Sequence, residues 1–416
     1  MAAIQSLRTL RYEPAVVGRL DDVIAPPYDV IDDALRAELA ALSPYNVVEI
    51  DLPVANGGDR YARARDTMAD WRSRGVLVWE DEPAMWALEQ DYTAPGGDSR
   101  RRRGFFARVR VEDYGAGRIR PHERTHPGPK EDRLRLTRAT GANLSPIFSL
   151  FPDPEGAARS AIDRAAEGDP FASPLDHDGN VNRLWRIFDP ELVSELQRAL
   201  SDAELLIADG HHRYETARVY ADEVGGEGDH RYVLMLLCSL SDPGLTIFPT
   251  HRLVRGDRDA IRSALERDFE LEPIDAADLE PPPGDGALLT LGYLDSAERR
   301  PYRATLRDQA IADRALEGMP GAYRRLDTAV LEALILRDAL GMGQHDIAHL
   351  NGLGYSKDYG HALAEVESGD WDAGFFLRAT PVEQVQEVAA TGESMPPKST
   401  YFYPKIPTGL VFNLLR

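Results

Sequence analysis

The sequence contains very little cysteine and very little lysine. Cys238 is the single cysteine among 416 residues, so the chain cannot form an internal disulfide, and an oxidising compartment is not implied. One cysteine also cannot build a thiolate site, and we expect no structural zinc. Lysine occurs only at Lys130, Lys357, Lys398 and Lys405, so arginine supplies nearly all of the basic charge.

Long hydrophobic runs are missing as well. The longest apolar run near the middle of the chain, Val233–Cys238, is far shorter than the roughly 20 residues that a membrane-spanning helix needs. The segment Met1–Leu10 lacks the apolar core of a secretory signal peptide. We therefore expect a cytoplasmic protein with no membrane partner.

Acidic residues clearly outnumber basic ones. The chain has 69 Asp and Glu against 48 Lys and Arg, which gives a formal net charge of −21. This balance argues against a nucleic-acid partner, because such binding draws its affinity from basic side chains on phosphates. Many carboxylates with few lysines fit either a surface adapted to high salt or a codon bias towards arginine, and neither identifies a substrate.

The length of the chain predicts more than one hydrophobic core, since a single core rarely grows past about 250–300 residues. Segments of strand and helix character are mixed along the chain, which indicates an α+β fold with mixed sheets in two lobes. We expect an N-terminal α+β lobe at residues 1–140, a middle module at 141–255 and a C-terminal α+β lobe at 256–416. Residues 281–284 would form a connection between lobes, and a homodimer is possible in this organisation.

Local patterns give further expectations for the first third of the chain. Asn46–Leu52 alternates as a strand would, and Arg60–Gly75 has a helical pattern closed by glycine. Met85–Tyr92 and Gly104–Val111 are predicted strands of a sheet. The run Arg100–Arg103 follows a Gly-Gly turn, so we expect it at a solvated hairpin tip.

A predicted strand-to-helix turn at Asp209–Arg213 is the strongest functional signal. Leu205–Ala208 has the pattern of a buried strand, and a helical pattern runs from Tyr214 to Val224. The N–H groups and the dipole of a first helical turn form a ready anion-binding site. Gly210 would let a phosphate approach the backbone closely.

The side chains of this turn fit phosphate chemistry. Arg213 could bind a phosphate with two nitrogens, and Asp209 could hold a magnesium ion or cap the helix. His211 and His212 add proton-transfer or phosphate-binding capacity. The alternative is a capped helix with two surface histidines, although a His-His pair between Asp and Arg is unusual for a simple cap.

A second signal is the spacing His122-Glu123-x-x-His126, which formally matches a zinc-protease helix. The run Pro127-Gly128-Pro129 follows at once, and a helix does not run comfortably through it. We therefore expect a loop here and no catalytic zinc.

The wider segment, residues 115–145, is polar and rich in Gly and Pro, and a long stretch without regular structure is usually functional. We interpret it as a polar clamp that closes on an anionic substrate. In this interpretation His122 and Glu123 bind substrate, and Arg124 and Lys130 bind phosphate. The alternative is a solvated loop.

Two further segments carry candidate site residues. A turn with two prolines precedes Tyr28 and Asp29, which we expect to line the site. Met395–Lys405 concentrates two of the four lysines among Ser, Thr and Tyr, and we expect Lys398 and Ser399 to bind the substrate. The alternatives are an ordinary turn and a docked C-terminal strand.

Together these segments resemble the family known as domain of unknown function 1015. The matching segments are Ala25–Ile31, Asn46–Leu52, His122–Arg133, Asn143–Phe148, Asp209–Ala217 and Met395–Pro404. The strand that ends in Asp209-Gly210-His211-His212-Arg213 is also similar to the second motif of the ParB and sulfiredoxin superfamily, in which a Gly-x-x-Arg turn holds nucleotide phosphates. One branch of that superfamily phosphorylates free serine with a nucleoside diphosphate as donor.

This resemblance implies a ParB-like nucleotide-binding module at residues 141–255, with Asp209, His211, His212 and Arg213 around the transferring phosphate. The implied function is a magnesium-dependent phosphotransferase that uses ATP or ADP and acts on a small hydroxylated metabolite, such as serine or phosphoserine. His211 is the first candidate to accept the hydroxyl proton, and Asp29 is the second. The chain has His-His where ParB has Glu-Arg and lacks a basic DNA-binding domain, so nucleic-acid binding is not implied.

Two other functions remain open at this point. One is a nucleotide-sensing regulatory protein without turnover, which would need the phosphate-binding turn but no proton acceptor. The other is a metal-dependent phosphatase that uses the same groups with water as the nucleophile. The surplus of ionisable histidines favours an enzyme over a regulatory protein.

Overall fold

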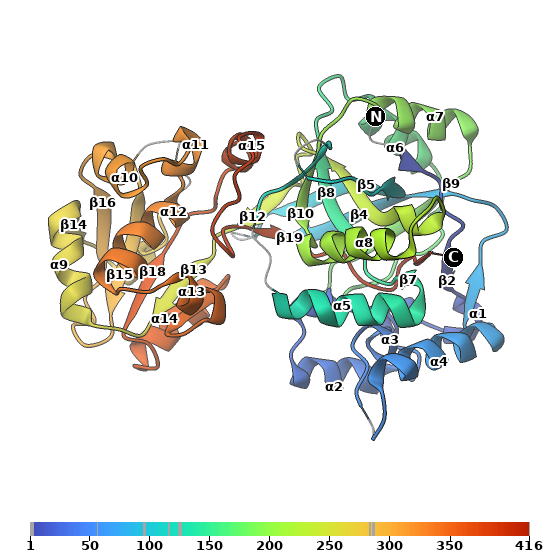
Figure 1. Cartoon of the computed structure of the whole chain (residues 1–416), viewed down its shortest axis with the longest axis horizontal. Helices are drawn as coiled ribbons and strands as arrows, with labels where there is room; N and C mark the ends of the chain where they lie inside the picture. The colour runs from blue at the N-terminus through green and yellow to red at the C-terminus, as the bar shows by residue number, and fades with distance from the viewer. Residues whose placement is uncertain are drawn as a thin grey trace. The chain divides into compact units, whose positions relative to one another are not determined.

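The computed structural model describes residues 4–55, 57–94, 97–114, 117–123, 127–282, 284 and 288–415, and only the backbone of residues 127–129. By its backbone contacts the chain divides into two compact units (Figure 1). Unit 1 contains Met1–Pro121, Thr125–Thr246 and Pro404–Arg416, and unit 2 contains His122–Arg124 and Ile247–Tyr403. This grouping differs from the expected divisions at residues 140 and 255, and residues 281–284 lie within unit 2.

Unit 1 is built on an eight-stranded mixed sheet. Its strands are β1 (Ile4–Gln5), β4 (Met85–Thr93), β5 (Ser99–Arg110), β6 (Ile119–Pro121), β8 (Ile147–Phe151), β9 (Val181–Ile187), β10 (Leu205–Asp209) and β11 (Tyr232–Ser239). Their order is β6-β10-β8-β11-β5-β4-β9, and β1 pairs with β5. The pairs β10·β6 and β11·β8 are parallel, whereas β10·β8 and β11·β5 are antiparallel.

The central strands of this sheet are covered on both faces. Every residue of β8 is buried, and so is every residue of β11 after its first, as expected for strands with apolar neighbours on both sides. Helices α6 (Ala157–Ala165) and α7 (Pro190–Ala199) share the sheet's core, and α8 (His211–Val224) contributes Tyr214 and Ala217 to it. The strand β10 and the helix α8 therefore rest on a rigid, packed support.

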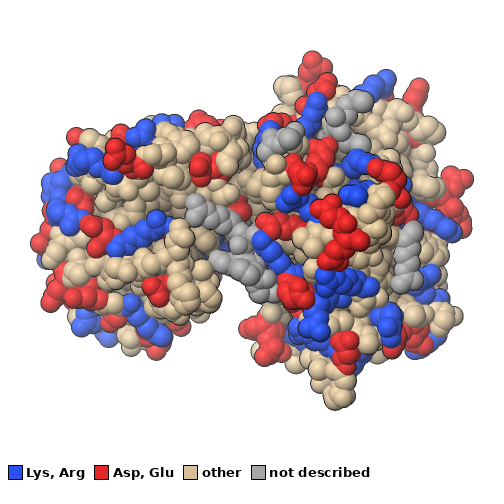
Figure 2. All heavy atoms as spheres, viewed as in Figure 1, with Lys and Arg blue, Asp and Glu red and all other residues tan. Residues whose placement is uncertain are grey.

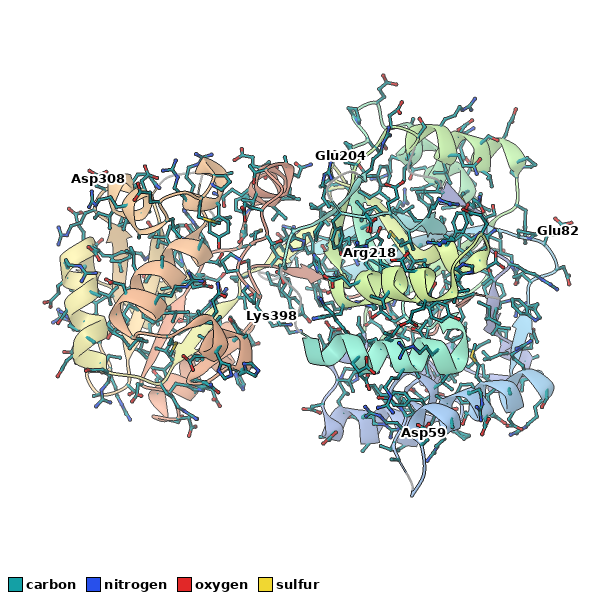
Figure 3. The ribbon with its side chains drawn as sticks, viewed as in Figure 1. Asp59, Glu82, Glu204, Arg218, Asp308 and Lys398 are labelled. Atoms are coloured by element: carbon teal, nitrogen blue, oxygen red, sulfur yellow. The ribbon has the colours of Figure 1, made fainter. Side chains whose placement is uncertain are left out.

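A second core of unit 1 lies mainly among helices α2 (Asp33–Leu42), α3 (Val48–Asp51), α4 (Arg60–Ser73) and α5 (Pro127–Thr140). Helix α4 begins after Asp59, whose side chain accepts a hydrogen bond from Tyr61 N at 2.9 Å (Figure 3). Helix α5 packs against both α4 and α8 (Figure 1). The remaining elements are α1 (Pro14–Val17), η1 (Leu20–Asp22), η2 (Tyr28–Val30), η3 (Asp229–Arg231) and the strand pairs β2 (Leu10–Tyr12) with β3 (Leu77–Trp79) and β7 (Ala142–Asn143) with β20 (Asn413–Leu414).

Unit 2 contains a six-stranded antiparallel sheet with its own core. Its strands are β14 (Phe269–Pro273), β16 (Tyr302–Leu306), β15 (Thr290–Asp295), β18 (Ala373–Phe376), β13 (His251–Val254) and β17 (Leu353–Ser356), in that order across the sheet. The helices are α9 (Arg258–Asp268), η4 (Ala276–Asp278), α10 (Gln309–Ala315), α11 (Gly321–Arg324), α12 (Asp327–Leu331), the π-helix η5 (Glu332–Ala339), α13 (Gln344–His349), α14 (Tyr359–Glu367) and α15 (Val382–Ala390). The strands β12 (Thr246–Phe248) and β19 (Tyr401–Tyr403) form a separate pair.

The predicted α+β class is confirmed, with a mixed sheet in unit 1 and an antiparallel sheet in unit 2. The predicted strands Met85–Tyr92 and Gly104–Val111 correspond to β4 and β5, and the predicted helix Arg60–Gly75 corresponds to α4. Acidic and basic side chains are interspersed over the face seen in Figure 2. Across the described ranges, no helix has both the length and the apolar character that crossing a bilayer requires.

Two predictions of local structure are wrong. The strand predicted at Asn46–Leu52 and the loop predicted around Lys130 both contain helices. Val48–Asp51 forms α3 inside the predicted strand, and Asn46 Oδ1 accepts a hydrogen bond from Val48 N at 3.1 Å as the chain turns into this short helix. The loop expected around Lys130 is instead the start of α5, which begins at Pro127. A proline fits the first position of a helix because the N–H that it lacks has no partner within the helix there.

The run Arg100–Arg103 does not form a solvated tip, because it lies within β5. Strand alternation turns Arg102 into the core, where the residue is 1 % exposed. Its guanidinium donates to Gln90 Oε1 and, at 2.5 Å, to the Pro404 carbonyl oxygen, and it stacks on the ring of Phe148. A run of like charges thus concealed one buried structural arginine.

Candidate functional site

The predicted strand-to-helix junction at the Asp209–Arg213 turn is confirmed. Strand β10 ends at Asp209, Gly210 has a φ of 97°, and α8 begins at His211. This backbone conformation favours glycine, and a Cβ at Gly210 would lie 2.9 Å from Arg213 Nε. No side chain in the described ranges caps α8, so Asp209 is not its cap and the helix start keeps the polarity of an anion site.

The guanidinium of Arg213 is buried and held by neighbouring groups. Nη1 donates to Ser145 Oγ at 2.8 Å and to the carbonyl oxygen of Pro146, and Nη2 donates to Asp209 Oδ2 at 2.7 Å. Protein groups therefore already occupy both terminal nitrogens, which does not leave them for the two-pronged phosphate grip expected from the sequence. Arg213 supplies a fixed positive charge instead.

Asp209 lies between two cations. Its Oδ2 pairs with Arg213, and its Oδ1 accepts a hydrogen bond from Lys405 Nζ at 3.2 Å. Burial would raise the pKa of Asp209, but the charges of Lys405 and Arg213 outweigh burial and hold this pKa well below its usual range. Since each carboxylate oxygen already has a cationic partner, Asp209 is poorly suited to the role of metal ligand or proton acceptor.

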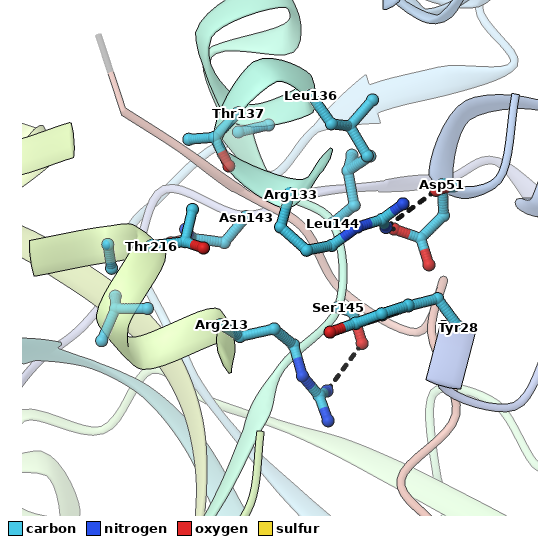
Figure 4. Close-up of a pocket in the computed structure, with 13 residues that line it drawn as sticks. Tyr28, Asp51, Arg133, Leu136, Thr137, Asn143, Leu144, Ser145, Arg213 and Thr216 are labelled. Carbon is cyan, nitrogen blue, oxygen red and sulfur yellow. Dashed lines mark hydrogen bonds and ion pairs between the residues drawn. The ribbon is translucent and has the colours of Figure 1, made fainter. Parts of the chain in front are cut away.

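A cavity of about 450 Å³, counted with its open mouth, lies beside the first two turns of α8 (Figure 4). Its walls come from η2, α3, α5, α8, β11 and the segment Ala142–Ser145. Its polar lining residues are Tyr28, Asp51, Arg133, Thr137, Asn143, Ser145, Arg213 and Thr216. Its apolar lining residues are Leu136, Ala142, Leu144, Ala217 and Val233. The cavity can therefore accept a small molecule with both charged and apolar groups.

Two of the arginines that line the cavity flank the ring of Tyr28. The guanidinium carbon of Arg133 lies 4.2 Å from the ring centroid, and that of Arg213 lies 6.0 Å from it (Figure 4). Arg133 also donates to Asp51 Oδ1 at 3.0 Å and, through two nitrogens, to Asp132. Burial raises the pKa of Asp51, with Arg133 acting in the opposite direction, and burial raises the pKa of Tyr28.

Two buried polar atoms of the cavity residues, Thr216 Oγ1 and Arg213 Nε, have no hydrogen-bond partner among the described residues. Thr216 is 4 % exposed and projects from α8 towards the cavity (Figure 4). Buried polar groups are usually satisfied, so an unpartnered pair at one cavity points to a polar ligand.

The structure brings together most of the candidate residues that lie in unit 1. His211 is buried on the first turn of α8 and lies close enough to Asp209 to lower its pKa, and His212 is half-buried beside it. Asp29 is exposed, next to Tyr28. Lys130 does not approach as an unpaired cation, because its Nζ forms an ion pair with Glu215 of α8.

The other described candidates, His122, Glu123, Lys398 and Ser399, belong to unit 2. His122 Nε2 lies 2.8 Å from Thr400 Oγ1, and Glu123 Oε1 accepts hydrogen bonds from the same hydroxyl and from Thr400 N. Ser399 Oγ bonds with Thr328 and donates to the Pro396 carbonyl oxygen, whereas Lys398 is exposed with a φ of 56° (Figure 3). These contacts join two distant segments of unit 2, and their proposed role in substrate binding remains a prediction. Arg124 and His126 lie outside the described residues.

Among the residues that line the cavity, sequence reasoning named only Tyr28 and Arg213, and for Lys405 it gave no more than a general expectation of an anion contact in Met395–Lys405. Asp51, Arg133, Ser145 and Thr216 line the cavity, and Lys405 pairs with Asp209. Asp51, Arg133 and Ser145 fall within segments that carry the family resemblance, and Lys405 is one of only four lysines, so weak signals existed. Thr216 gave no signal beyond its place on α8. In the parts of the chain that the structure describes, no group of three or more His, Cys, Asp or Glu side chains could hold a metal ion.

The chain is thus an α+β protein with a cavity that is lined in part by charged side chains. The cavity lies beside the turn at Gly210, where strand β10 leads into helix α8. The chain belongs to the family described as protein of unknown function (DUF1015), whose profile matches residues 4–329. No curated protein matches the sequence.

Several solved structures are similar to this chain at low identity. A conserved hypothetical protein from Pyrococcus furiosus is 16% identical with a TM-score of 0.37, over 74% of this chain and 95% of that one. A free serine kinase in complex with AMP is 14% identical with a TM-score of 0.36, over 74% and 92%. SbnI from Staphylococcus aureus, with a C-terminal truncation, is 10% identical with a TM-score of 0.35, over 73% and 85%. Likenesses this distant carry no argument about what this chain binds.

Proposed function

We propose that this protein is a small-molecule phosphotransferase whose donor nucleotide places a phosphate at the Asp209–Arg213 turn. The observation that carries the proposal is the uncapped start of α8 beside a cavity whose wall contains Arg133 and Arg213. Phosphoryl transfer needs mainly positioning and neutralisation of charge, and a helix N-terminus with fixed cations supplies both.

The polar wall of the cavity supports a small zwitterionic acceptor such as serine. Asp51 offers a carboxylate to an ammonium group, and the adjacent Arg133 offers positive charge to a carboxylate. The unpartnered hydroxyl of Thr216 can bond to a further polar group of the ligand. This combination of charges suits an amino acid that carries a hydroxyl better than it suits an uncharged sugar or a lipid.

The hydroxyl proton of the acceptor needs a base, and we assign this role to His211, with Asp29 as the second candidate. His211 lies on the first turn of α8, close to Asp209, and histidine is the side chain that most often accepts a proton in catalysis. Asp29 is exposed beside Tyr28 and would act only on a substrate at the mouth of the cavity.

A magnesium ion is expected to accompany ATP or ADP, but Asp209 does not fit as its ligand. Both oxygens of that carboxylate are held by Arg213 and Lys405. Magnesium commonly keeps several waters and binds through substrate phosphates with one or two carboxylates, and Asp51 is the acidic side chain among the residues that line the cavity. When bound, the ion would neutralise phosphate charge.

The test is product analysis with purified protein, serine, and either ADP or ATP, with and without magnesium. Formation of phosphoserine that is lost in His211→Asn and kept in the exposed control His177→Asn supports the proposal. Nucleotide binding in thermal melts without any product would favour the nucleotide-sensing protein. Release of inorganic phosphate from phosphoserine without nucleotide would favour the phosphatase.

A further inference from the structure

The last segment of the chain, residues 404–415, returns to unit 1 and is almost entirely buried. We call it the return segment. Its Phe412 forms an isolated bridge with Leu10, and its strand β20 pairs with β7, which leads into the cavity wall. The return segment lies beyond residue 329, where the match to the family profile ends.

The backbone around Lys405 is fixed from two sides. Gln90 Nε2 donates to the carbonyl oxygen of Lys405 at 3.2 Å, and the buried Arg102 donates to that of Pro404 at 2.5 Å. Gln90 and Arg102 also bond to each other, so the two contacts form one network in the core. This anchoring aims the Lys405 ammonium at Asp209 Oδ1, 3.2 Å away.

Thr408 reaches the same site by a second route. Its backbone exchanges two hydrogen bonds with Ala25, three residues before Tyr28, at 3.1 and 2.8 Å. Its Oγ1 donates to Ser145 Oγ at 3.0 Å, the atom to which Arg213 Nη1 also donates at 2.8 Å.

This arrangement determines where the hydroxyl hydrogen of Ser145 can point. The oxygen of Ser145 accepts from both Thr408 and Arg213, so its own hydrogen is directed elsewhere. Ser145 lines the cavity, and a ligand there can accept that hydrogen.

We propose that Lys405 and Thr408 are positioning residues of the anion site, so that the return segment completes the site. Lys405 fixes Asp209 as an anion, which in turn holds Arg213, and it adds a positive charge at the α8 turn. Thr408 orients Ser145 so that its hydroxyl donates into the cavity. This inference rests on the proposed function, because it assumes that the ligand carries a phosphate.

The role of Lys405 is tested by titration calorimetry with ADP on the full chain. Lys405→Met should weaken ADP binding by roughly 10- to 150-fold, the range for losing a charge-assisted contact, and Lys405→Arg should recover most of the loss. The matched control is Lys357→Met, which removes the same charge from an exposed lysine of unit 2 that donates to Tyr401. Binding by Lys405→Met equal to that of Lys357→Met overturns the proposal.

The role of Thr408 is tested by a pair of variants that differ in one hydroxyl group. Thr408→Val removes the donor to Ser145 and should weaken ADP binding about 2- to 12-fold, whereas Thr408→Ser keeps the donor and should bind as the wild type does. A purely structural role predicts equal binding in both variants once each is folded in thermal melts. Equal binding therefore refutes the role assigned to Thr408.

The outcomes also separate this inference from the proposed function. If the wild-type protein binds ADP but makes no phosphoserine, the proposed phosphotransferase activity is refuted. A loss of ADP binding in Lys405→Met would then still support the positioning role. If the wild type makes phosphoserine and Lys405→Met binds ADP as the wild type does, only the positioning role is refuted. If the wild type binds neither ADP nor inorganic phosphate, both the proposed function and the positioning role are refuted.

Discussion

Replacement of Thr216 by valine should affect stability and ligand binding in opposite directions. The hydroxyl of Thr216 is buried beside the cavity and has no partner among the described residues. Valine has nearly the same shape, and its helix propensity is close to that of threonine, so the change removes chiefly one unsatisfied polar atom. The ligand-free protein should therefore become more stable.

The size of the gain follows from the cost of an unsatisfied buried hydroxyl. That cost is about 1–3 kcal/mol, and we take its lower end because α8 lies at an open cavity. A gain of about 1 kcal/mol raises the melting temperature of a unit of this size by roughly 2–4 °C. If the hydroxyl bonds to the ligand, the same change should weaken ADP or serine binding about 2- to 12-fold.

Thr140→Val is the matched control. Thr140 is also buried on a helix of unit 1, but its Oγ1 donates to the Leu136 carbonyl oxygen at 2.9 Å. Its replacement should lower the free energy of unfolding by about 0.5–1.5 kcal/mol. Urea titrations and thermal melts of both variants test the reasoning. A loss of stability in Thr216→Val similar to that in Thr140→Val would show that the Thr216 hydroxyl has a partner, and unchanged ligand binding would remove it from the site.

Three further predictions concern the α8 turn. Replacing Arg213 with methionine should lower the free energy of unfolding by up to about 3–5 kcal/mol in urea, because it breaks a buried ion pair; a loss below about 1 kcal/mol would contradict this. His211→Asn should reduce kcat about 100-fold or more with ADP affinity largely kept, and full activity would exclude His211 as the base. The lowered pKa of Asp209 means that its ionised form stabilises the fold above about pH 4, and that this contribution is lost as pH falls through the folded-state pKa. Asp209→Asn should therefore flatten the dependence of stability on pH below about pH 4, and an unchanged acid limb in urea titrations would count against the ion pairs.

The α8 turn could be predicted from sequence because its determinants are local. A buried strand, a glycine and a helical pattern follow one another within Leu205–Val224, and each leaves its own periodicity in the sequence. The same reasoning failed at Asn46–Leu52, where a short apolar segment fits either period. There the side chain of Asn46 favours the helical turn, a choice that alternation alone does not reveal.

The overall composition of a segment gave wrong predictions where the position of a single residue within its strand or helix was decisive. The run Arg100–Arg103 is highly charged, but a strand turns alternate residues to opposite faces, so Arg102 enters the core. The prolines at the start of α5 were interpreted as breakers, although the first turn of a helix accepts proline. In both cases the position of the residue within its element decides the outcome.

The cavity could not be predicted because it joins residues that are far apart in the sequence. Tyr28, Asp51, Arg133 and Arg213 belong to four separate elements, and the sheet and the packing of α5 against α8 bring them together. The partner of Asp209 comes from Lys405, 196 residues further along the chain. Pairing at this distance depends on the tertiary fold, which leaves no periodic pattern in the sequence.

Binding and chemistry place different demands on this cavity, and the difference separates the enzyme from a nucleotide sensor. A sensor requires the charges of Arg133 and Lys405 and the hydroxyl of Thr216, but it has no use for a base. An enzyme additionally requires a proton acceptor beside the phosphate, the role that we propose for His211 of α8. If both His211→Asn and Lys405→Met weaken ADP binding to the same degree, the histidine acts only in binding, and a sensor explains the site. If Lys405→Met acts on binding and His211→Asn acts on kcat, binding and chemistry depend on different residues, and an enzyme rather than a sensor explains the site.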